Sequence, residues 1–394
     1  MQQETDPLLP IPDATSAAHS VCVADYIRKT IAAAGGLISF AEYMHLALYA
    51  PGLGYYSAGT TKFGEAGDFV TAPEVSPVFG RVLARQCASV LAELDAPAVL
   101  EFGAGSGKLA GDLLQALAEL DALPHSYQIL EVSADLRERQ ESYLTSEVPE
   151  LADKVTWLDQ LPDTHTGVIV ANEVLDAMPV ERFVRLAEGS AQLCVGIDAD
   201  KFIIAQRPAP DVLAAAIRQI EIDLGRRLPI GYVSEICLAV PAWIGDLARL
   251  LNRGFAFLFD YGVSRREYYA EDRSQGWLRC HFRHHAHNDP LILPGIQDLT
   301  AWVDFSTVAA AAVDHGLEIA GFVTQAQFLI GGGLAEELAG LTDLPLAAQL
   351  QLSGQVKLLT LPGEMGENFK CLGLSRDMDI SLSAFAVADR TAAL

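Results

Sequence analysis

Residues 99–107 hold the pattern that most constrains the fold of this chain: apolar residues lead to an acidic residue, and glycines then alternate with small residues. Leucines recur at helical spacing directly afterwards, between Leu109 and Leu120. The pattern predicts a strand, a tight turn and a helix. Glycines in the turn would let the backbone approach a ligand closely, and the helix N-terminus would offer it free N–H groups. We therefore expect a nucleotide-like ligand to bind here.

The spacing of the glycines discriminates between two cofactor classes. A dinucleotide fingerprint, G-x-G-x-x-G, would place its third glycine at position 108, where this chain has Lys108. The spacing here is G-x-G-x-G, and an acidic residue precedes it. This compact form resembles motif I of class I methyltransferases, which use S-adenosylmethionine, while a nicotinamide-dependent oxidoreductase stays open as a competing reading. The cofactor contacts that we expect in this stretch are Glu101, Gly103, Ala104, Gly105 and Gly107.

Three further apolar segments end in polar residues, at Glu131, Asp159 and Asn172. Open α/β sheets bind ligands at the carboxyl ends of their strands, so we expect all three side chains in the cofactor site, with Val132 beside them. A carboxylate can accept hydrogen bonds from both ribose hydroxyls, which is the role predicted for Glu131. We predict that Asp159 takes the adenine amino group. The segments together predict an α/β fold with a doubly wound sheet.

The turn after the fourth of these strands carries two carboxylates, Glu173 and Asp176. Residues three apart in a turn or at a helix start can share one face, and two carboxylates can grip a guanidinium in bidentate fashion. The opposing interpretation is that Asp176 only caps a helix while Glu173 is solvated. From the residues alone, both interpretations stay open.

Two loop regions supply the remaining candidates. The loop over residues 49–77 is rich in Gly, Pro and aromatic residues. We expect Asp68 and Thr71 to hold the methionine part of the cofactor and Glu74 to face the substrate, unless these residues only bond their own turn. Tyr55 and Tyr56 are pocket walls or ordinary core. The turn-rich residues 263–300 carry His284 and His287, which we interpret as loop anchors or substrate-side groups rather than as metal ligands, because their spacing matches no standard zinc pattern.

Composition excludes several classes of protein. The net charge of −24 would repel DNA, RNA and anionic lipid, so we expect no nucleic-acid binding. We expect no membrane insertion, because no run approaches the roughly eighteen uninterrupted apolar residues that a membrane helix needs. The charge serves solubility or favours a cationic partner. Six scattered cysteines, and a first segment that resembles no signal or transit peptide, predict a reduced, cytoplasmic setting.

The order of the segments predicts the organisation of the chain. We expect a disordered N-terminus, a helical and loop extension forming a lid, the cofactor-binding half of the core, a hairpin and helical insertion, the second half of the core, and a tail. The boundaries that we predict are 1–20, 21–96, 97–181, 182–254, 255–378 and 379–394. The strand at 255–262 ends in Asp260, a helix runs from Asp304 to Gly316, and residues 369–374 form the last strand.

These motifs resemble the MidA-like family, whose mitochondrial members are methyltransferases of complex I assembly. The shared motifs span roughly residues 37–376 in the family's order. They are GLGYY (52–56), GDF to PE (67–74), EFGAGSG (101–107), EVS (131–133), NE to P (172–179), DYG (260–262), HNDP (287–290), PGIQD (294–298), VDF (303–305) and EMGE (364–367).

The resemblance implies a class I methyltransferase core with a seven-stranded sheet whose last strand is antiparallel, S-adenosylmethionine as cofactor, and methylation of a protein arginine on a client such as a respiratory complex subunit. For this chemistry we predict Glu173, Asp176 and Glu74 as catalytic residues, and Asp260 and Asp304 on the substrate side. A homodimer is compatible with it. A non-catalytic assembly factor that binds S-adenosylmethionine is the alternative. The chain departs from the family at Trp277 and Trp302, where we expect a small residue and a histidine.

Overall fold

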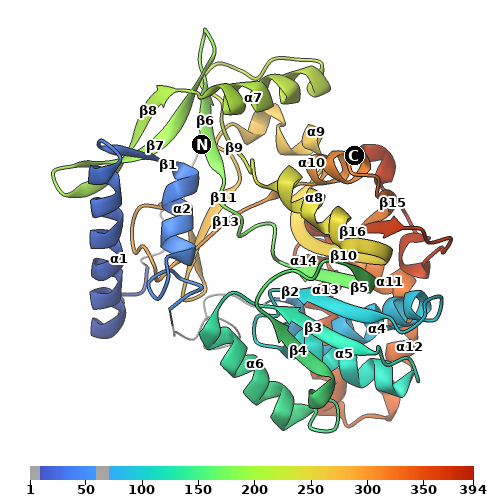
Figure 1. Cartoon of the computed structure of the whole chain (residues 1–394). Helices are drawn as coiled ribbons and strands as arrows, with labels where there is room; N and C mark the ends of the chain where they lie inside the picture. Colours follow the sequence, from blue (N-terminus) through green and yellow to red (C-terminus); the bar gives the residue numbers. More distant parts are fainter. Residues whose placement is uncertain (1–8, 59–70) are drawn as a thin grey trace. The chain divides into compact units, whose positions relative to one another are not determined.

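A computed structural model describes residues 9–58 and 71–394 of the chain (Figure 1). The chain divides into two compact units. Unit 1 comprises Met1–Phe69, Asp176–Val240 and Arg265–Trp302, and unit 2 comprises Val70–Leu175, Pro241–Ser264 and Val303–Leu394. Asp68 lies outside the described residues. No helix in the described part of the chain is long and apolar enough to cross a membrane.

Unit 2 is built on a mixed sheet in the strand order β15-β16-β10-β5-β2-β3-β4. β16 is antiparallel to both of its neighbours, and the other pairs along this path are parallel. The short β14 adds an eighth strand beside β10. The strands are β2 (Ala98–Phe102), β3 (Ser126–Leu130), β4 (Val155–Leu158), β5 (His165–Asn172), β10 (Leu251–Val263), β14 (Val303–Asp304), β15 (Glu318–Thr324) and β16 (Phe369–Arg376). The predicted seven-stranded, doubly wound sheet with an antiparallel last strand is confirmed.

Helices cover both faces of this sheet. Alternate residues of a strand point to opposite faces, so Val99, Val168 and Phe257 join the core beneath α4, α5 and α11, while Phe102 contacts Trp243 of α8 on the other face. The helices of unit 2 are α3 (Ala72–Val75), α4 (Pro77–Leu91), α5 (Lys108–Glu119), α6 (Ala134–Glu147), α8 (Val240–Leu250), α10 (Phe305–Asp314), α11 (Gln325–Gly332), α12 (Leu334–Glu337), α13 (Leu346–Thr360) and α14 (Met365–Asn368). The 3-10 turns are η1 (Ala152–Lys154), η3 (Leu341–Asp343), η4 (Ser383–Phe385) and η5 (Thr391–Ala393).

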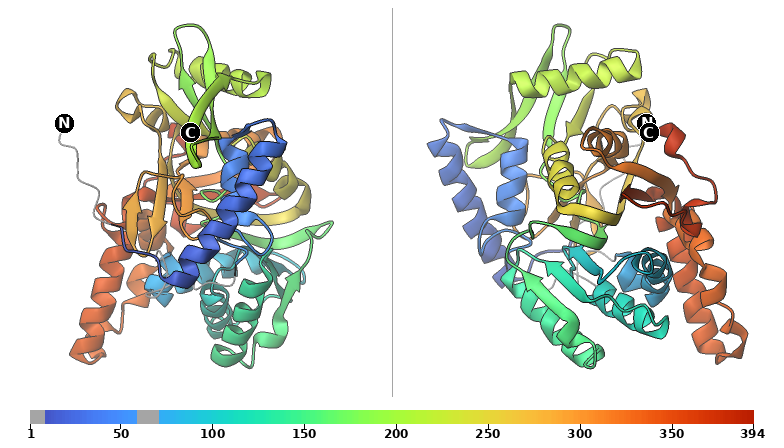
Figure 2. Two further views of the ribbon diagram at one scale, coloured as in Figure 1. Left: turned by 90° about the vertical axis from the view of Figure 1, so that its left-hand side faces the viewer. Right: turned by 45° about the vertical axis from the view of Figure 1, so that its right-hand side comes forward.

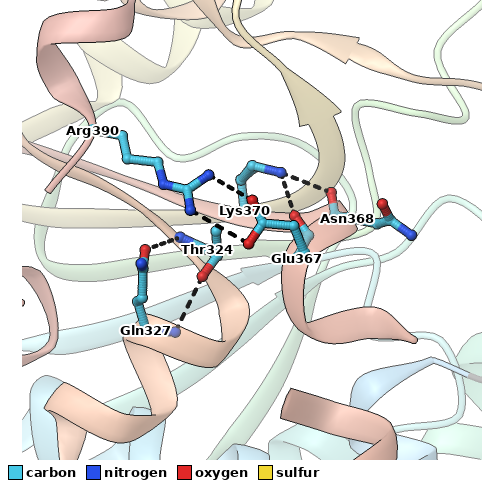
Figure 3. A network of polar contacts seen from close by, with 6 residues as sticks. All are labelled: Thr324, Gln327, Glu367, Asn368, Lys370 and Arg390. Atoms are coloured by element: carbon cyan, nitrogen blue, oxygen red, sulfur yellow. Dashed lines mark hydrogen bonds and ion pairs between the residues drawn. The ribbon is translucent and has the colours of Figure 1, made fainter. Parts of the chain in front are cut away.

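The C-terminal segment is tied to the edge of the sheet by a polar network (Figure 3). Arg390 forms an ion pair with Glu367 of α14 at 2.6 Å, and its backbone N–H donates to Phe322 O of β15. Lys370, at the start of β16, donates to the carbonyl oxygens of Glu367 and Asn368. These contacts fix α14, and therefore the end of the segment that contains α13, against the sheet.

Unit 1 contains two small sheets. The first has the order β1-β7-β6-β9, with β8 also paired to β7, and the second has the order β12-β11-β13. The strands are β1 (Leu37–Ser39), β6 (Glu181–Arg185), β7 (Ser190–Asp198), β8 (Lys201–Pro208), β9 (Val233–Ile236), β11 (Leu278–Phe282), β12 (His285–His287) and β13 (Asp298–Ala301). The helices are α1 (Ala14–Ala33), α2 (Phe40–Tyr49), α7 (Asp211–Leu224), α9 (Arg265–Tyr268) and η2 (Glu271–Arg273).

Two expectations differ from the structure of unit 1. We expected disorder up to residue 20, but α1 already begins at Ala14, because the side chain of Asp13 accepts hydrogen bonds from two backbone N–H groups of the first turn. We also expected residues 263–300 to be mostly turns, yet β11 and β12 form a hairpin there. Its two-residue turn places Arg283 and His284 at φ values of +48° and +62°, which suits a primed hairpin turn.

Candidate cofactor site and acceptor turn

The glycine-rich loop connects β2 to α5 in unit 2. Gly103, Gly105 and Gly107 have φ values of +62°, +56° and +85°, so all three occupy the left-handed region that only glycine enters readily. Ser106 accepts a hydrogen bond from the N–H of Lys108, the first residue of α5. The loop therefore turns tightly and presents bare backbone immediately before a helix N-terminus. Such a loop suits a ligand that must lie close to the main chain.

Gln140 of α6 fixes this loop, and the sequence analysis missed it. Its side chain is fully buried; Nε2 donates to Gly105 O at 3.0 Å and to the Glu131 carboxylate at 3.1 Å, and Oε1 accepts from Trp157 of β4. One amide thus joins the loop to the ends of β3 and β4. The sequence held a signal, because Gln140 stands at four-residue spacing between Leu136 and Leu144. The structure buries this face of α6, with all three side chains inside.

Glu101, the acidic residue before the glycines, is buried under the loop. Burial raises the pKa of its carboxyl to about 7, although the hydroxyl of Tyr127, which donates to it at 2.6 Å, opposes the rise. The negative charge of Glu131 raises the pKa further. This carboxyl lies close to its protonation midpoint at neutral pH, so a cationic group bound nearby would favour its ionised form.

The residues after β3 fit the adenosine part of S-adenosylmethionine. Glu131 is buried, and its carboxylate accepts hydrogen bonds from Ser133 N–H and Gln140. A carboxylate at this strand end is the group type that accepts hydrogen bonds from ribose hydroxyls. The neighbouring Val132 leaves 83% of its surface exposed, which gives the flat face of an adenine an apolar surface to lie on. The residues present therefore fit the cofactor.

Asp159 contacts an arginine side chain at the end of β4. Its side chain is highly exposed and forms an ion pair with Arg137 of α6 at 2.8 Å. The same guanidinium donates to Leu158 O, at the end of β4. The structure thus engages Asp159 with Arg137, and its predicted contact with the adenine amino group stays a prediction.

Glu74 contacts the glycine-rich loop of unit 2. It belongs to the short helix α3, for which Thr71 is the N-cap residue, and it accepts a hydrogen bond from the hydroxyl of Ser106 in the glycine-rich loop. Glu74 therefore helps to shape the loop, and its predicted catalytic role stays a prediction. The contact of Thr71 with the methionine part stays a prediction.

The turn after β5 holds a carboxylate in a strained conformation. Glu173 has φ +54°, a region that side chains other than glycine enter at a cost, and it lies half-buried. Its N–H donates to Phe259 O of β10, and the Asn172 amide donates to its carboxylate. A Cβ on Gly103 would meet the side chain of Val174 at 3.6 Å. The turn that presents Glu173 therefore packs against the glycine-rich loop.

Asp260 holds this turn in place. It is fully buried, and its carboxylate accepts hydrogen bonds from Leu175 N–H and Tyr261 N–H, both at 2.9 Å. Asp260 therefore acts as a positioning residue for the turn, and its predicted substrate-side role stays a prediction. The side chain of Asp304 caps α10 by accepting from Ser306 N–H and Thr307 N–H, and its substrate-side role likewise stays a prediction.

The other predicted residues belong to unit 1. Asp176 is buried there, in a turn rather than at a helix start, and its carbonyl accepts from Ala301 N–H. Burial and the charges of Asp298 and Asp176 raise the pKa of Tyr56 well above its usual value, and its hydroxyl donates to Asp298 at 3.0 Å. Tyr55 is core, with 1% of its surface exposed. The pairing of Asp176 with Glu173 stays a prediction.

The two predicted histidines differ in burial within the β11–β12 hairpin of unit 1. His284 is exposed at its turn, whereas His287 is buried on β12 and its Nδ1 accepts from Asp289 N–H. The contacts of His287 suit the loop-anchor alternative, and a substrate-side position stays a prediction for both histidines. The two tryptophans that depart from the family pattern, Trp277 and Trp302, stack on each other with ring centroids 4.2 Å apart.

The fold and the loop together define a class I methyltransferase that uses S-adenosyl-L-methionine. Residues 82–323 match the family model of S-adenosyl-L-methionine-dependent methyltransferases named Methyltransf_28, and the chain belongs to this family. It is 31% identical over 371 residues to the zebrafish (Danio rerio) protein arginine methyltransferase NDUFAF7, mitochondrial, covering 86% of this chain and 83% of the relative. The human protein of that name is 30% identical, over 86% of this chain and 80% of its own length.

Two solved structures from Burkholderia thailandensis are similar over nearly the whole chain. One, bound to S-adenosyl-homocysteine, is 43% identical with a TM-score of 0.92, and the match covers 98% of this chain and 100% of that one. A native structure of an uncharacterized protein matches with the same identity and coverage and a TM-score of 0.89. The cofactor class expected from the glycine spacing is thereby confirmed, and a nicotinamide cofactor is not supported.

Proposed function

We propose that this methyltransferase modifies an arginine side chain of a protein. The observation that carries the proposal is the turn after β5, where Glu173 is held at φ +54° and packs next to the glycine-rich loop through Val174. A strained residue persists only where its surroundings enforce it, and such residues cluster at functional sites. The names of the relatives, protein arginine methyltransferases at about 30% identity, support the same substrate class.

The chemistry requires a carboxylate in this position. S-adenosylmethionine, when bound, supplies a methyl group activated by a sulfonium. A guanidinium is protonated at neutral pH and its nitrogen lone pairs are delocalised, so it is a weak nucleophile. The carboxylate of Glu173 can accept two of its N–H groups in parallel, which orients the group and draws its positive charge away from the reacting nitrogen. Each N–CH₃ bond that forms would replace one S–CH₃ bond of the cofactor, which would leave as S-adenosylhomocysteine, and one N–H proton would pass to water.

Residues around Glu173 prepare it for this role. The Asn172 amide donates to its carboxylate at 3.2 Å, and Asp260 fixes the backbone two residues later. Holding two reactants in a productive geometry can supply roughly 7–11 kcal/mol of a barrier. The overall charge of −24 would also favour encounter with a basic peptide, because a field of one sign steers the opposite charge.

The test is methyl transfer from labelled S-adenosylmethionine to a protein extract, with the modified residues identified by mass spectrometry. We expect label on arginine, and we expect Glu173→Gln to abolish transfer while S-adenosylhomocysteine binding persists. Glu93→Gln, the same change at an exposed position beyond α4, is the matched control and should retain activity. Asp176→Asn tests the second predicted carboxylate.

Two results would contradict the proposal. Label confined to residues other than arginine would assign a different acceptor. Cofactor binding without transfer to any protein, even to a purified respiratory complex subunit, would instead favour a non-catalytic assembly factor.

A further inference from the structure

Helix α13 of unit 2 leaves several leucine side chains largely exposed. Leu346, Leu350 and Leu358 leave 69%, 66% and 43% of their surface exposed, and Leu359 is the one fully buried side chain of the helix. Figure 2 shows the red-orange helical segment that contains α13 projecting from the sheet of its unit in both views. Contiguous exposed apolar surface of this kind marks an interaction site.

The exposed side of α13 has a defined shape. Leu346, Leu350, Gly354 and Leu358 follow at four-residue spacing, so they form one row along the helix, which we call the α13 ridge. Gly354 is exposed in mid-helix, and a Cβ built on it would meet no heavy atom within 4 Å. Glycine destabilises a helix interior relative to alanine, and nothing in its own chain requires it here. It leaves a notch in the ridge that another helix can enter.

The α13 ridge is complementary to itself. When a two-fold axis relates two copies, each contact occurs twice: residue i of one copy contacts residue j of the other, and residue j of the first contacts residue i of the second. If two copies of α13 cross antiparallel about a point near residue 352, Leu350 of each copy faces the Gly354 notch of the other. Leu346 then faces Leu358. A large side chain meets a gap at the centre of the contact, which is how ridges pack into grooves.

The charge of the segment also favours a second copy. Residues 344–363 contain Lys357 and no acidic residue, although the chain holds 51 acidic residues among 394. Two chains that each carry −24 repel one another, and this segment lets them approach without carboxylates of its own facing each other. A basic client would prefer the acidic surface elsewhere. We propose that the α13 ridge is the contact surface of a homodimer.

The base of α13 is firmly anchored, so the ridge is preorganised. Leu359 O accepts from the buried Gln325 amide at 2.9 Å, and α14 follows within the network of Figure 3. The ridge leucines, with the flanking Leu344 and Leu361, present roughly 300–500 Å² of apolar surface. Specific interfaces need about 500 Å² on each side, so the ridge reaches only the lower end of this range and we expect a weak dimer.

Sedimentation velocity of the full chain between about 1 and about 100 µM tests the dimer. We expect the wild type to shift from monomer to dimer over this range, and Leu350→Glu to raise the dissociation constant about a hundredfold or more, because it buries one unpaired carboxylate from each copy in the apolar contact. Val313→Glu, which adds the same charge at a 58% exposed site on α10, is the control and should dimerise as the wild type does. A wild type that stays monomeric at about 100 µM, or a Leu350→Glu variant that dimerises normally, would overturn the proposal.

Cross-linking tests the register of the two helices. In a background with the exposed Cys22 replaced by serine, a mixture of Leu350→Cys and Gly354→Cys chains should form disulfide-linked dimers faster than either variant alone. Equal rates for the mixture and the separate variants would contradict the crossing near residue 352. Neither experiment measures methyl transfer, so the dimer can fail without affecting the proposed function.

Discussion

Replacing Glu101 with glutamine should change how the stability of the protein depends on pH. The carboxyl has an ordinary pKa of 4.5, and burial raises it to about 7 in the folded chain. Between these two values the folded state keeps a proton that the unfolded state has lost, so the free energy of unfolding falls as pH rises. The stabilisation is fully present below pH 4.5 and is lost by the time pH exceeds about 7.

The size of the effect follows from the shift. A rise from 4.5 to about 7 corresponds to about 3 kcal/mol between the protonated and ionised folded states. The Glu101→Gln side chain has the same shape, can accept from the Tyr127 hydroxyl and cannot ionise. The variant should therefore lack this part of the pH dependence, and it should gain about 3 kcal/mol relative to the wild type between about pH 5 and about pH 8.

Urea unfolding of both proteins without cofactor, followed by tryptophan fluorescence, measures this difference. The quantity of interest is the change in the wild-type-minus-variant free energy between the two pH values, because other titrating groups cancel in it. Glu93→Gln, at an exposed site, should show no such change. Parallel pH profiles for the wild type and Glu101→Gln would refute the reasoning, since the carboxyl would then ionise as freely in the folded chain as in the unfolded one.

Three further predictions concern residues that support the site. Asp260→Asn should lower turnover at least tenfold with little change in cofactor affinity, because it weakens the hydrogen bonds that fix the Glu173 turn; steady-state kinetics and calorimetry separate the two effects. Gln140→Leu should destabilise the protein by about 1–3 kcal/mol and weaken S-adenosylhomocysteine binding, because the carbonyl of Gly105 and the indole N–H of Trp157 lose their partner. An unchanged affinity for S-adenosylhomocysteine would argue against the role of Gln140. Ser106→Ala should weaken cofactor binding by about 1 kcal/mol, because it frees Glu74 and the first N–H of α5; binding as tight as that of the wild type would contradict this.

Much of the core sheet was predictable from the chain because its strands are continuous apolar runs. A parallel strand buried on both faces lacks the polar alternation of a surface strand, and the segments at β2, β5 and β10 show this directly. Their polar ends predicted which edge binds the ligand. The glycine spacing added the cofactor class.

What escaped prediction depends on contacts between distant segments. β1 has only three residues. It forms because Leu37 pairs with Gly196 of β7, a partner far away in the sequence that no local pattern predicts. Asp260 and Asp304 have the residue type of substrate-binding groups, but the chain around them turns their carboxylates onto backbone N–H groups. Residue type therefore identified candidates, while the direction of each side chain came from the tertiary structure.

The most direct test of the central claim is the affinity of the purified protein for S-adenosylhomocysteine, measured by isothermal titration calorimetry alongside Gly105→Val. Gly105 has φ +56°, where a β-branched side chain is strained and would project from the bare loop. We expect the wild type to bind and the folded variant to lose binding by at least a hundredfold. A wild type that does not bind, or a Gly105→Val variant that binds as tightly, would contradict the placement of the cofactor on this loop.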